Sequence, residues 1–333
     1  MFTRLELSNF TVFEKLNLEF SPGINILVGA NGTGKTHLMK LLYCIQGALT
    51  PNSKSFAEKL GAVFRPRDGD FRRLTRRRPG RTNSEVSTSW EDKKIVASWH
   101  NASGEMLFKP STRMTLESPV FIPVKEVLSF APGFISLYDK YRMEIDEIYY
   151  DVLKLAFLPS RRGAAAEKDK NILETIRQLI GGRVVTEGEN FYLRHGNANL
   201  EMHLVAEGYR KIALVWQLIH NGSLLEGTTL FWDEPEANLN PFMMQYVAKI
   251  LLLLAHRGIQ VFAATHNYAF LKEIDLQKKQ TPVTYFSLSD SENNGVQVNS
   301  SLSYATISPN KIADEYLRLY DLEMQKAFTG GLK

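Results

Sequence analysis

The sequence predicts an α/β fold in which helices pack on a mixed, partly parallel central sheet. Three observations favour this fold class. First, an apolar run at residues 24–28 leads through a glycine-rich loop into an amphipathic segment at 36–46, which is typical of a strand–loop–helix unit. Second, the segments 228–232 and 260–265 are apolar on both faces, as buried parallel strands are. Third, residues 2–7 and 16–20 alternate apolar and polar side chains, which predicts strands.

The middle of the chain differs in composition from its two ends. Residues 50–118 are rich in Ser, Thr and Arg, and short alternating segments within them predict a small antiparallel sheet preceded by a basic loop. These segments lie at 86–90, 95–100 and 105–108. Helical patterns follow at 144–158 and 168–180, and further strand patterns at 184–185, 191–194 and 199–204.

The remaining segments read as a second α/β part. A helix is expected after Asn240 as N-cap and Pro241 at the first helical position, and Gly258 follows its end. The C-terminal stretch predicts two strands and one helix, at 283–288, 296–299 and 311–327.

Composition excludes several classes of protein. Of the 333 residues, 44% are apolar and 23% are charged, which suits a globular chain with a substantial core. No apolar run reaches about 18 residues, so no transmembrane helix is expected. The first ten residues lack the apolar stretch of a secretory signal. A single cysteine, Cys44, excludes an internal disulfide framework and a cysteine-built zinc site, and we expect a cytoplasmic protein.

Positive charge is concentrated in one segment. The net charge is +4, and eight arginines against two aspartates give the window 65–81 a charge of +6. This window could follow a nucleic-acid backbone, dock an acidic protein or form a solvated loop, and the three interpretations stay open. Its central arginines are the candidate contacts: Arg72, Arg73, Arg76, Arg77 and Arg78.

The glycine-rich loop is the most specific motif. Residues 29–36, Gly-Ala-Asn-Gly-Thr-Gly-Lys-Thr, match G-x-x-x-x-G-K-[ST] and lie between a strand pattern and a helix pattern. Glycines let backbone N–H groups curl around phosphates, and the positive end of the following helix adds to the attraction. Lys35 is expected to reach the β- and γ-phosphates, and Thr36 offers its hydroxyl to Mg²⁺.

Two further motifs end the predicted buried strands. The first strand ends in Asp233-Glu234, where we expect Asp233 to hold Mg²⁺ through water and Glu234 to act as the base toward the attacking water. The second ends in His266, 32 residues after Glu234, which could contact the γ-phosphate.

Together these motifs resemble those of the ABC-type ATPases, in the RecF/SMC/OLD branch rather than the transporter branch. The resemblance covers about residues 1–46 and 200–270 closely and the middle only loosely. Five segments carry it: the opening 5–10, the P-loop region 22–36, a signature-like motif at 205–211, a Walker B motif with D-loop at 233–241, and a switch histidine at 265–266.

The resemblance implies a mechanism that acts between subunits. Two ATP molecules with Mg²⁺ would be enclosed in a head-to-tail homodimer, or a higher homo-oligomer, with the signature helix of one subunit on the ATP of the other. The N–H groups of a helix N-terminus are suited to meet a γ-phosphate. The implied reactive residues are Lys35, Glu234 and His266. The implied ATP-binding residues are Gly29, Asn31, Gly32, Thr33, Gly34, Lys35, Thr36, His37, Ala206, Glu207, Gly208 and Asn238.

Some positions depart from the pattern of the family. Its signature serine is Ala206 here, so a hydroxyl contact to the γ-phosphate is missing. No clear Q-loop glutamine is found. A strand pattern at 119–124, followed by Lys125-Glu126, lies where that loop should be. Glu126 is expected to face the metal or, in the simpler interpretation, to form a solvated surface pair with Lys125. Residues 10–13 are candidates for the adenine contact, with core aromatic residues as the alternative.

The resemblance gives the expected fold class and its parts: an ABC-type P-loop fold with a mixed central sheet, an antiparallel β subdomain and a helical subdomain that carries the signature motif. We expect a single ATPase domain over 1–333. No long coiled coil is predicted, which excludes an SMC-type arm, and the 67 residues after His266 leave little room for a Toprim nuclease domain. The expected parts are a P-loop lobe at 1–50, an antiparallel insertion with the basic loop at 51–130, a helical and hairpin insertion at 131–204, the signature-to-switch segment at 205–275, and the C-terminal strands and helix at 276–333.

The biological role is inferred from resemblance alone. Residues 206–211 and 233–239 are similar to the ATPase subunits of bacterial anti-phage systems such as Septu, PARIS and OLD-related cassettes, which implies control of a separately encoded nuclease or toxin. The alternatives are a RecF-like repair ATPase acting on DNA, a transporter subunit and a non-hydrolysing scaffold. The long insertion argues against the transporter subunit, which needs a membrane partner, and the intact Lys35, Glu234 and His266 argue against the scaffold.

Overall fold

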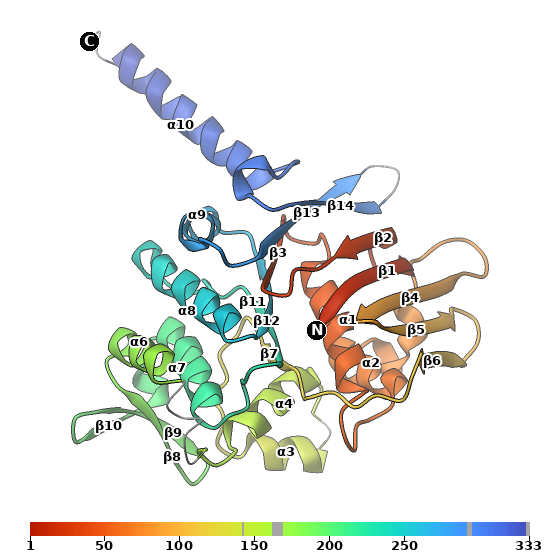
Figure 1. Cartoon of the computed structure of the whole chain (residues 1–333), viewed down its shortest axis with the longest axis horizontal. Helices are drawn as coiled ribbons and strands as arrows, with labels where there is room; N and C mark the ends of the chain where they lie inside the picture. Colours follow the sequence, from red (N-terminus) through yellow and green to blue (C-terminus); the bar gives the residue numbers. More distant parts are fainter. Residues whose placement is uncertain (142, 162–168, 292–294, 331–333) are drawn as a thin grey trace.

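In the part of the chain that the structure describes, eleven strands form one sheet. This sheet runs through most of the molecule (Figure 1). The computed structural model describes residues 1–141, 143–161, 169–291 and 295–330. The strands in order across the sheet are β6 (Met106–Pro110), β5 (Lys93–His100), β4 (Asn83–Trp90), β1 (Phe2–Phe10), β2 (Phe13–Glu19), β14 (Gly295–Ser301), β13 (Val283–Ser291), β3 (Ile24–Gly29), β12 (Gln260–Thr265), β11 (Thr229–Asp233) and β7 (Val120–Ile122). The fold class expected from the sequence is therefore confirmed.

The half of the sheet from β13 to β7 is parallel. Every residue of β3, β11 and β12 is buried, which explains why their sequences are apolar on both faces. The register pairs Asp233 with Ala264 on β12, and Thr265 of β12 with Val28 on β3. The carboxyl ends of these three strands therefore lie at one edge of the sheet, where the P-loop, Asp233-Glu234 and His266 follow them.

The antiparallel half contains the strands predicted from the middle of the chain. β4, β5 and β6 are present, but β4 pairs with β1. They therefore extend the main sheet instead of forming the small sheet of their own that the sequence predicts. A separate three-stranded sheet consists of β8 (Arg183–Glu187), β9 (Asn190–His195) and β10 (Ala198–Glu201). The strand predicted at 199–204 ends early because residues 202–204 form a 3₁₀ turn.

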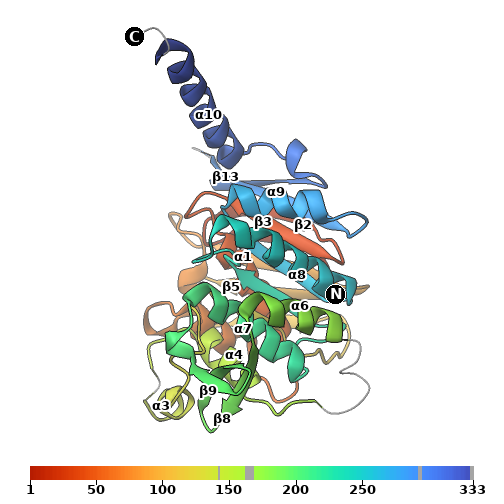
Figure 2. The ribbon, with the colours of Figure 1, turned by 90° about the vertical axis from the view of Figure 1, so that its left-hand side faces the viewer.

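The helices pack on both faces of the sheet and in a lobe beside it (Figures 1 and 2). The predicted helix at 144–158 begins later, because the Asp146 side chain caps it by accepting a hydrogen bond from the N–H of Ile148. In the predicted helix at 168–180, residue 168 lies outside the described residues. The helices are α1 (Lys35–Gly47), α2 (Phe56–Phe64), α3 (Phe134–Tyr141), α4 (Glu147–Ala156), α6 (Lys170–Ile180), α7 (Glu207–His220), α8 (Met244–His256), α9 (Tyr268–Gln277) and α10 (Lys311–Gly330).

Two hydrophobic clusters cover the two faces of the sheet. On β3, Ile26 belongs to the cluster that includes α8 and α9, whereas its neighbour Leu27 belongs to the cluster of α1 and α2. This alternation is the strand period of two, and it places α1 on the face opposite α8. Among the described residues, no helix is both long and apolar enough to cross a bilayer.

A buried polar network ties α2 to α4, and so joins the sheet to the lobe that contains α7. The Lys59 ammonium donates to Glu147 Oε1 at 2.7 Å and to Asp151 Oδ2 at 2.5 Å. The Tyr43 hydroxyl on α1 donates to the same Asp151 oxygen at 2.6 Å. Burial lowers the pKa of Lys59, but Asp151 and Glu147 outweigh it and hold that pKa above the ordinary value. The ammonium is therefore charged and holds both carboxylates together.

Candidate functional site

The glycine-rich loop connects β3 to α1 as the motif predicts. Gly32 and Gly34 have φ angles of 84° and 88°, a region that suits glycine. A Cβ atom on Gly34 would lie 2.7 Å from Phe13 Cζ and from Val12 Cγ2, so no larger residue fits without movement. The loop therefore turns tightly onto the N-terminus of α1, where unpaired backbone N–H groups favour an anion.

Lys35 lies inside this loop. Its ammonium is buried and donates to the carbonyl oxygens of Gly29 at 2.7 Å and Ala30 at 2.9 Å. Burial lowers its pKa, while the carboxylates of Asp233 and Glu234 act in the opposite direction. The geometry places a cation at the centre of the loop, within reach of any phosphate that the loop encloses.

Thr36 and Asp233 come together from positions 197 residues apart. Thr36 Oγ1 donates to Asp233 Oδ2 at 2.9 Å. Burial raises the pKa of Asp233, and the hydrogen bond from Thr36 opposes that shift. A hydroxyl and a carboxylate are oxygen ligands of the kind that Mg²⁺ prefers, together with waters and phosphate oxygens. Within the described part of the chain, no group of three or more His, Cys, Asp and Glu side chains could hold a metal.

Glu234 and His266 are also neighbours. Glu234 Oε1 lies 3.2 Å from His266 Nδ1, because the adjacent parallel strands β11 and β12 end side by side. Glu234 has a φ angle of 45°, which is strained for a residue with a side chain. Its N–H donates to the Ala264 carbonyl at 2.9 Å, which fixes the strained turn. The carboxylate is only partly buried, so a water molecule can reach it.

Glu236 is a buried titratable residue that the sequence reasoning missed. Thr265 Oγ1 donates to Glu236 Oε1 at 2.5 Å, and the other carboxyl oxygen is buried without a partner among the described atoms. Burial raises the pKa of Glu236 to about 7. The Lys211 ammonium on α7 is fully buried nearby and donates to the Glu234 carbonyl at 3.3 Å. Glu236 is the second glutamate of the Asp-Glu-Pro-Glu motif at 233–236, and its place in that motif is the sequence signal that could have identified it.

The signature-like motif forms the N-terminus of α7, as expected. Ala206 is the N-cap and supplies no side-chain hydrogen bond, so Glu207 and Gly208 open the helix without a capping hydroxyl. A Cβ on Gly208 would lie 2.3 Å from Leu239 Cδ2 and 2.7 Å from the Asn238 carbonyl oxygen. The motif and the D-loop are therefore in close contact within one chain.

Glu126 has a different environment from either expectation. It neither faces the candidate metal residues nor lies in solvent, since it is buried and its Oε1 pairs with Arg210 Nη1 at 2.6 Å. Arg210 Nε also donates to the Val205 carbonyl at 2.7 Å. The segment after β7 is thereby tied to the signature helix. Sequence alone could not pair the two residues, because 84 positions separate them.

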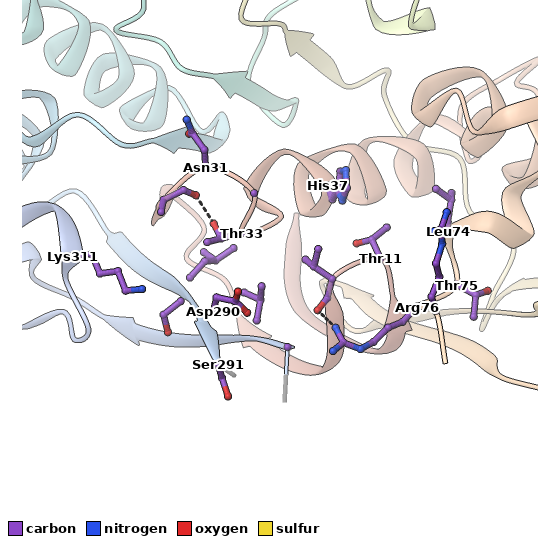
Figure 3. Close-up of a pocket in the computed structure, with 18 of the residues that line it drawn as sticks. Thr11, Asn31, Thr33, His37, Leu74, Thr75, Arg76, Asp290, Ser291 and Lys311 are labelled. Carbon is purple, nitrogen blue, oxygen red and sulfur yellow. Dashed lines mark hydrogen bonds between the residues drawn. The ribbon is translucent and has the colours of Figure 1, made fainter. Parts of the chain in front are cut away.

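A cavity of about 760 Å³ lies beside the P-loop (Figure 3). Asn31, Gly32, Thr33 and His37 line one side of it, and burial lowers the pKa of His37. Of the four residues proposed for an adenine contact, Thr11 and Val12 line the cavity, whereas Phe10 and Phe13 are core residues. The other described residues that line it are Ala30, Arg73, Leu74, Thr75, Arg76, Arg77, Leu288, Ser289, Asp290, Ser291, Gly295, Val296 and Lys311. This lining includes none of residues 206–208.

Several arginines of the basic segment (residues 65–81) form ion pairs or hydrogen bonds within the chain. Arg72 pairs with Asp70 at 2.8 Å, and Arg78 pairs with Glu14. The Arg76 guanidinium donates to the Val12 carbonyl at the wall of the cavity (Figure 3). Arg73 and Arg77 also line the cavity. Three of the five candidate arginines are thus placed beside the P-loop.

Two family models match the chain. One, described as "AAA domain, putative AbiEii toxin, Type IV TA system", matches residues 140–272. The other, described as "AAA domain", matches residues 4–109. The two matches contain the P-loop, the signature-like motif, Asp233-Glu234 and His266.

Curated relatives and solved structures agree with these matches. The DNA replication and repair protein RecF of Ligilactobacillus salivarius is 31% identical over 185 residues, which are 55% of this chain and 46% of that protein. RecF of Limosilactobacillus fermentum is 23% identical over 211 residues, 60% of this chain and 55% of that protein. The chain therefore spans about half the length of the curated relatives it matches. An SMC head, solved bound to the C-winged helix domain of ScpA, superimposes with a TM-score of 0.58 at 15% identity and covers 90% of this chain and 97% of that one. This chain has the same fold.

Proposed function

We propose that this chain, which has the fold and the motif set of the RecF/SMC-like ABC-type ATPases, binds ATP with Mg²⁺ and hydrolyses it between two copies of itself. The observation that carries the proposal is the convergence of five residues at one edge of the sheet. Lys35 and Thr36 come from α1, Asp233 and Glu234 from the end of β11, and His266 from the end of β12. Their separation in sequence makes this grouping specific.

Each residue has a role that its position supports. The P-loop N–H groups and Lys35 would bind the β- and γ-phosphates. Thr36 and Asp233, already 2.9 Å apart, would hold Mg²⁺, whose charge offsets that of the phosphates. Glu234 would accept a proton from the attacking water, and His266 would hold the Glu234 carboxylate and contact the γ-phosphate.

The second copy is proposed from the position of the signature motif. Ala206, Glu207 and Gly208 open α7 but do not line the cavity beside the P-loop of their own chain. A helix N-terminus that serves a phosphate must reach it directly, since the effect fades within the first turn. We therefore assign these residues, with Asn238 of the adjoining D-loop, to the ATP of a partner subunit. Since Ala206 has no hydroxyl, backbone N–H groups would make this contact.

The arginines beside the P-loop support an interaction with the nucleotide. Arg73, Arg76 and Arg77 line the cavity, and guanidinium groups suit phosphate oxygens and planar rings. The same basic segment also suits a nucleic-acid backbone. The two uses are separable, because loss of a nucleotide contact raises KM for ATP, whereas loss of a DNA contact reduces a salt-dependent affinity.

For the biological role we keep two candidates. One is control of a separately encoded nuclease or toxin in bacterial anti-phage defence; the match to a model described in terms of a toxin system supports it. The other is a RecF-like role on DNA, supported equally by relatives described as DNA replication and repair proteins. The first predicts a stoichiometric protein partner, and the second predicts ATP hydrolysis stimulated by gapped DNA.

The chemistry is tested with the purified Glu234→Gln variant. We expect ATP hydrolysis to fall by at least about 100-fold, because loss of a general base costs about 10²–10⁴ in rate, while ATP binding remains and ATP–Mg²⁺ shifts the protein to a dimer. Glu226→Gln, at an exposed position before β11, is the matched control and should hydrolyse ATP normally. A wild-type rate for Glu234→Gln would contradict the assigned role.

The role is tested by capture of tagged Glu234→Gln protein from its host with ATP and Mg²⁺, with and without nuclease treatment. A stoichiometric partner that survives nuclease would support the effector hypothesis. Recovery of repair proteins alone, lost on nuclease treatment, would support the RecF-like hypothesis.

A further inference from the structure

The C-terminal helix α10 extends away from the body of the molecule (Figures 1 and 2). Its base is anchored: Ile312 and Ala313 pack against the core, and the Tyr316 ring stacks on Tyr268 of α9 with centroids 4.5 Å apart. The Asn310 side chain caps the helix by accepting a hydrogen bond from the N–H of Ala313 at 3.1 Å. The first turn is thus held in place, and the rest of the helix projects from it.

The projecting part carries a broad apolar face. Apolar residues recur at spacings of three and four, so they share one side of the helix. On the projecting part they are Leu317, Tyr320, Met324, Ala327 and Phe328, and they continue the line of the anchored Ala313 and Tyr316. Tyr320 and Phe328 are 58% and 74% exposed, which is unusual for a contiguous apolar surface on a monomer. In proteins, most of the stability of a helix comes from packing of its amphipathic face, and here that face is uncovered.

The exposed rings of this face supply about half of the area that a stable interface buries. A buried aromatic side chain covers roughly 200 Å². At 51%, 58% and 74% exposure, the three rings of Tyr316, Tyr320 and Phe328 leave about 370 Å² uncovered on each chain. Two chains would then bury about 740 Å² from these rings alone, against about 1,200–2,000 Å² for a stable interface. Leu317 and Met324 on the same face add to this area.

The charge on the helix disfavours nucleic acid as the occupant. Lys311, Arg318 and Lys326 are outnumbered by Asp314, Glu315, Asp321 and Glu323, which gives α10 a net charge of −1. A phosphate backbone requires a basic surface.

The sequence of α10 is instead complementary to itself. In an antiparallel pair centred next to Tyr320, small Ala313 lies level with the large Phe328 of the second chain, and Leu317 lies level with Met324. Tyr320 falls beside the two-fold axis and so beside the same residue of the second chain. An isologous interface of this kind uses one patch twice and closes at two copies.

We propose that α10 pairs antiparallel with α10 of a second copy of this chain and forms a dimer that does not depend on nucleotide. This interface is separate from the ATP-dependent one of the proposed function. With both interfaces in one molecule, ATP would assemble these dimers into larger oligomers.

Light scattering with size-exclusion chromatography, without nucleotide, tests the pairing. The wild-type chain should be a dimer, and Leu317→Glu with Tyr320→Glu should make it a monomer with unchanged far-UV circular dichroism. Arg318→Glu, on the opposite side of the helix, changes the net charge by the same −2, since one positive charge is replaced by one negative charge, and it should leave the dimer intact. A monomeric wild-type chain, or a dimer that survives the double substitution, would overturn the proposal.

Cross-linking tests the antiparallel register without disturbing the fold. The native Cys44 is buried, so a single introduced cysteine reports on its own position. Tyr320→Cys should form a disulfide-linked dimer under mild oxidation, whereas Leu317→Cys should link only when mixed with Met324→Cys. Efficient self-linking of Leu317→Cys would indicate a parallel pair and overturn the register.

Discussion

Glu236 combines burial, one hydrogen bond and a nearby buried lysine at the junction of the D-loop and the switch strand. Its single donor is Thr265, whose Oγ1 also accepts a hydrogen bond from the N–H of Asn267, the residue after His266. Lys211 joins the signature helix to the backbone of Glu234. The D-loop, the switch strand and the signature helix thus meet around the Glu236 carboxyl group. A change in the charge of that group would alter the hydrogen bonds and electrostatic energy of all three.

The raised pKa of Glu236 makes a prediction about stability and pH. Its pKa is about 7 in the folded protein against 4.5 ordinarily, so the folded state retains a proton that the unfolded state releases between these values. The free energy of unfolding therefore falls as pH rises from 4.5 to 7, by up to about 3 kcal/mol. Glu236→Gln stays neutral and should lose this slope, which makes it more stable than wild type at pH 8.

Thermal unfolding at pH 5 and pH 8 measures this difference. The Glu226→Gln control should keep the wild-type slope, because its side chain is exposed. Parallel pH profiles for wild type and Glu236→Gln would show that Glu236 is ionised in the folded protein and would contradict the prediction.

At the scale of elements, the Glu126–Arg210 pair joins the segment after β7 to the start of α7. Arg210→Met would leave the buried Glu126 carboxylate without its cation, although the hydrogen bond from the Ser129 N–H remains. Removal of one partner of a buried pair costs about 3 kcal/mol or more. We expect urea unfolding to show a loss of about that size.

An exposed pair provides the control for this prediction. Arg177→Met breaks the surface pair with Glu174 on α6 and should change stability by less than about 1 kcal/mol. The double variant Glu126→Gln with Arg210→Met should regain part of the loss. Equal effects of the two arginine substitutions would mean that the Glu126–Arg210 pair does not hold the elements together.

At the scale of the whole molecule, the network around Lys59 connects the sheet to the signature lobe. Lys59→Met would leave Glu147 and Asp151 with fewer cations, although Lys54 still pairs with Glu147. We expect a loss of about 3 kcal/mol in the free energy of unfolding, because the buried Glu147 and the partly buried Asp151 lose their shared ammonium. Urea unfolding followed by tryptophan fluorescence measures it. A loss below about 1 kcal/mol would show that packing alone joins the two parts.

Nucleotide binding should stabilise the whole chain through linkage. A ligand that binds the folded state at 100 times its Kd adds about 2.7 kcal/mol. ATP–Mg²⁺ should therefore raise the Tm of Glu234→Gln protein, and Lys35→Ala should abolish the increase because the loop loses its cation. Thermal unfolding with and without ATP–Mg²⁺ checks this, with Lys278→Ala as the lysine control, since Lys278 is the C-cap of α9 and does not line the cavity beside the P-loop. An unchanged shift for Lys35→Ala would contradict the placement of the phosphates.

Local signals in the sequence determined most of the elements. The strand–loop–helix unit at the P-loop is specified by apolar residues, glycines and a helix start that lie within about 25 positions of one another. Helix α2 was missed even though Ser55 and Glu58 form a capping box, because the surrounding Ser, Thr and Arg residues suggested a loop. The antiparallel strands were found, but their pairing with β1 was not, since alternation does not identify the neighbouring strand.

The sequence by itself determined the candidate chemistry of this protein, because each motif is short and its residue types are suited to phosphate, metal or proton transfer. Only the tertiary structure decided which distant residues meet. Glu126 with Arg210, Glu236 with Thr265, and the arginines with the cavity beside the P-loop all depend on contacts between segments far apart in the chain. The exposed face of α10 is likewise evident only from the tertiary structure. The sequence pattern of an amphipathic helix is identical whether its apolar face is buried or exposed.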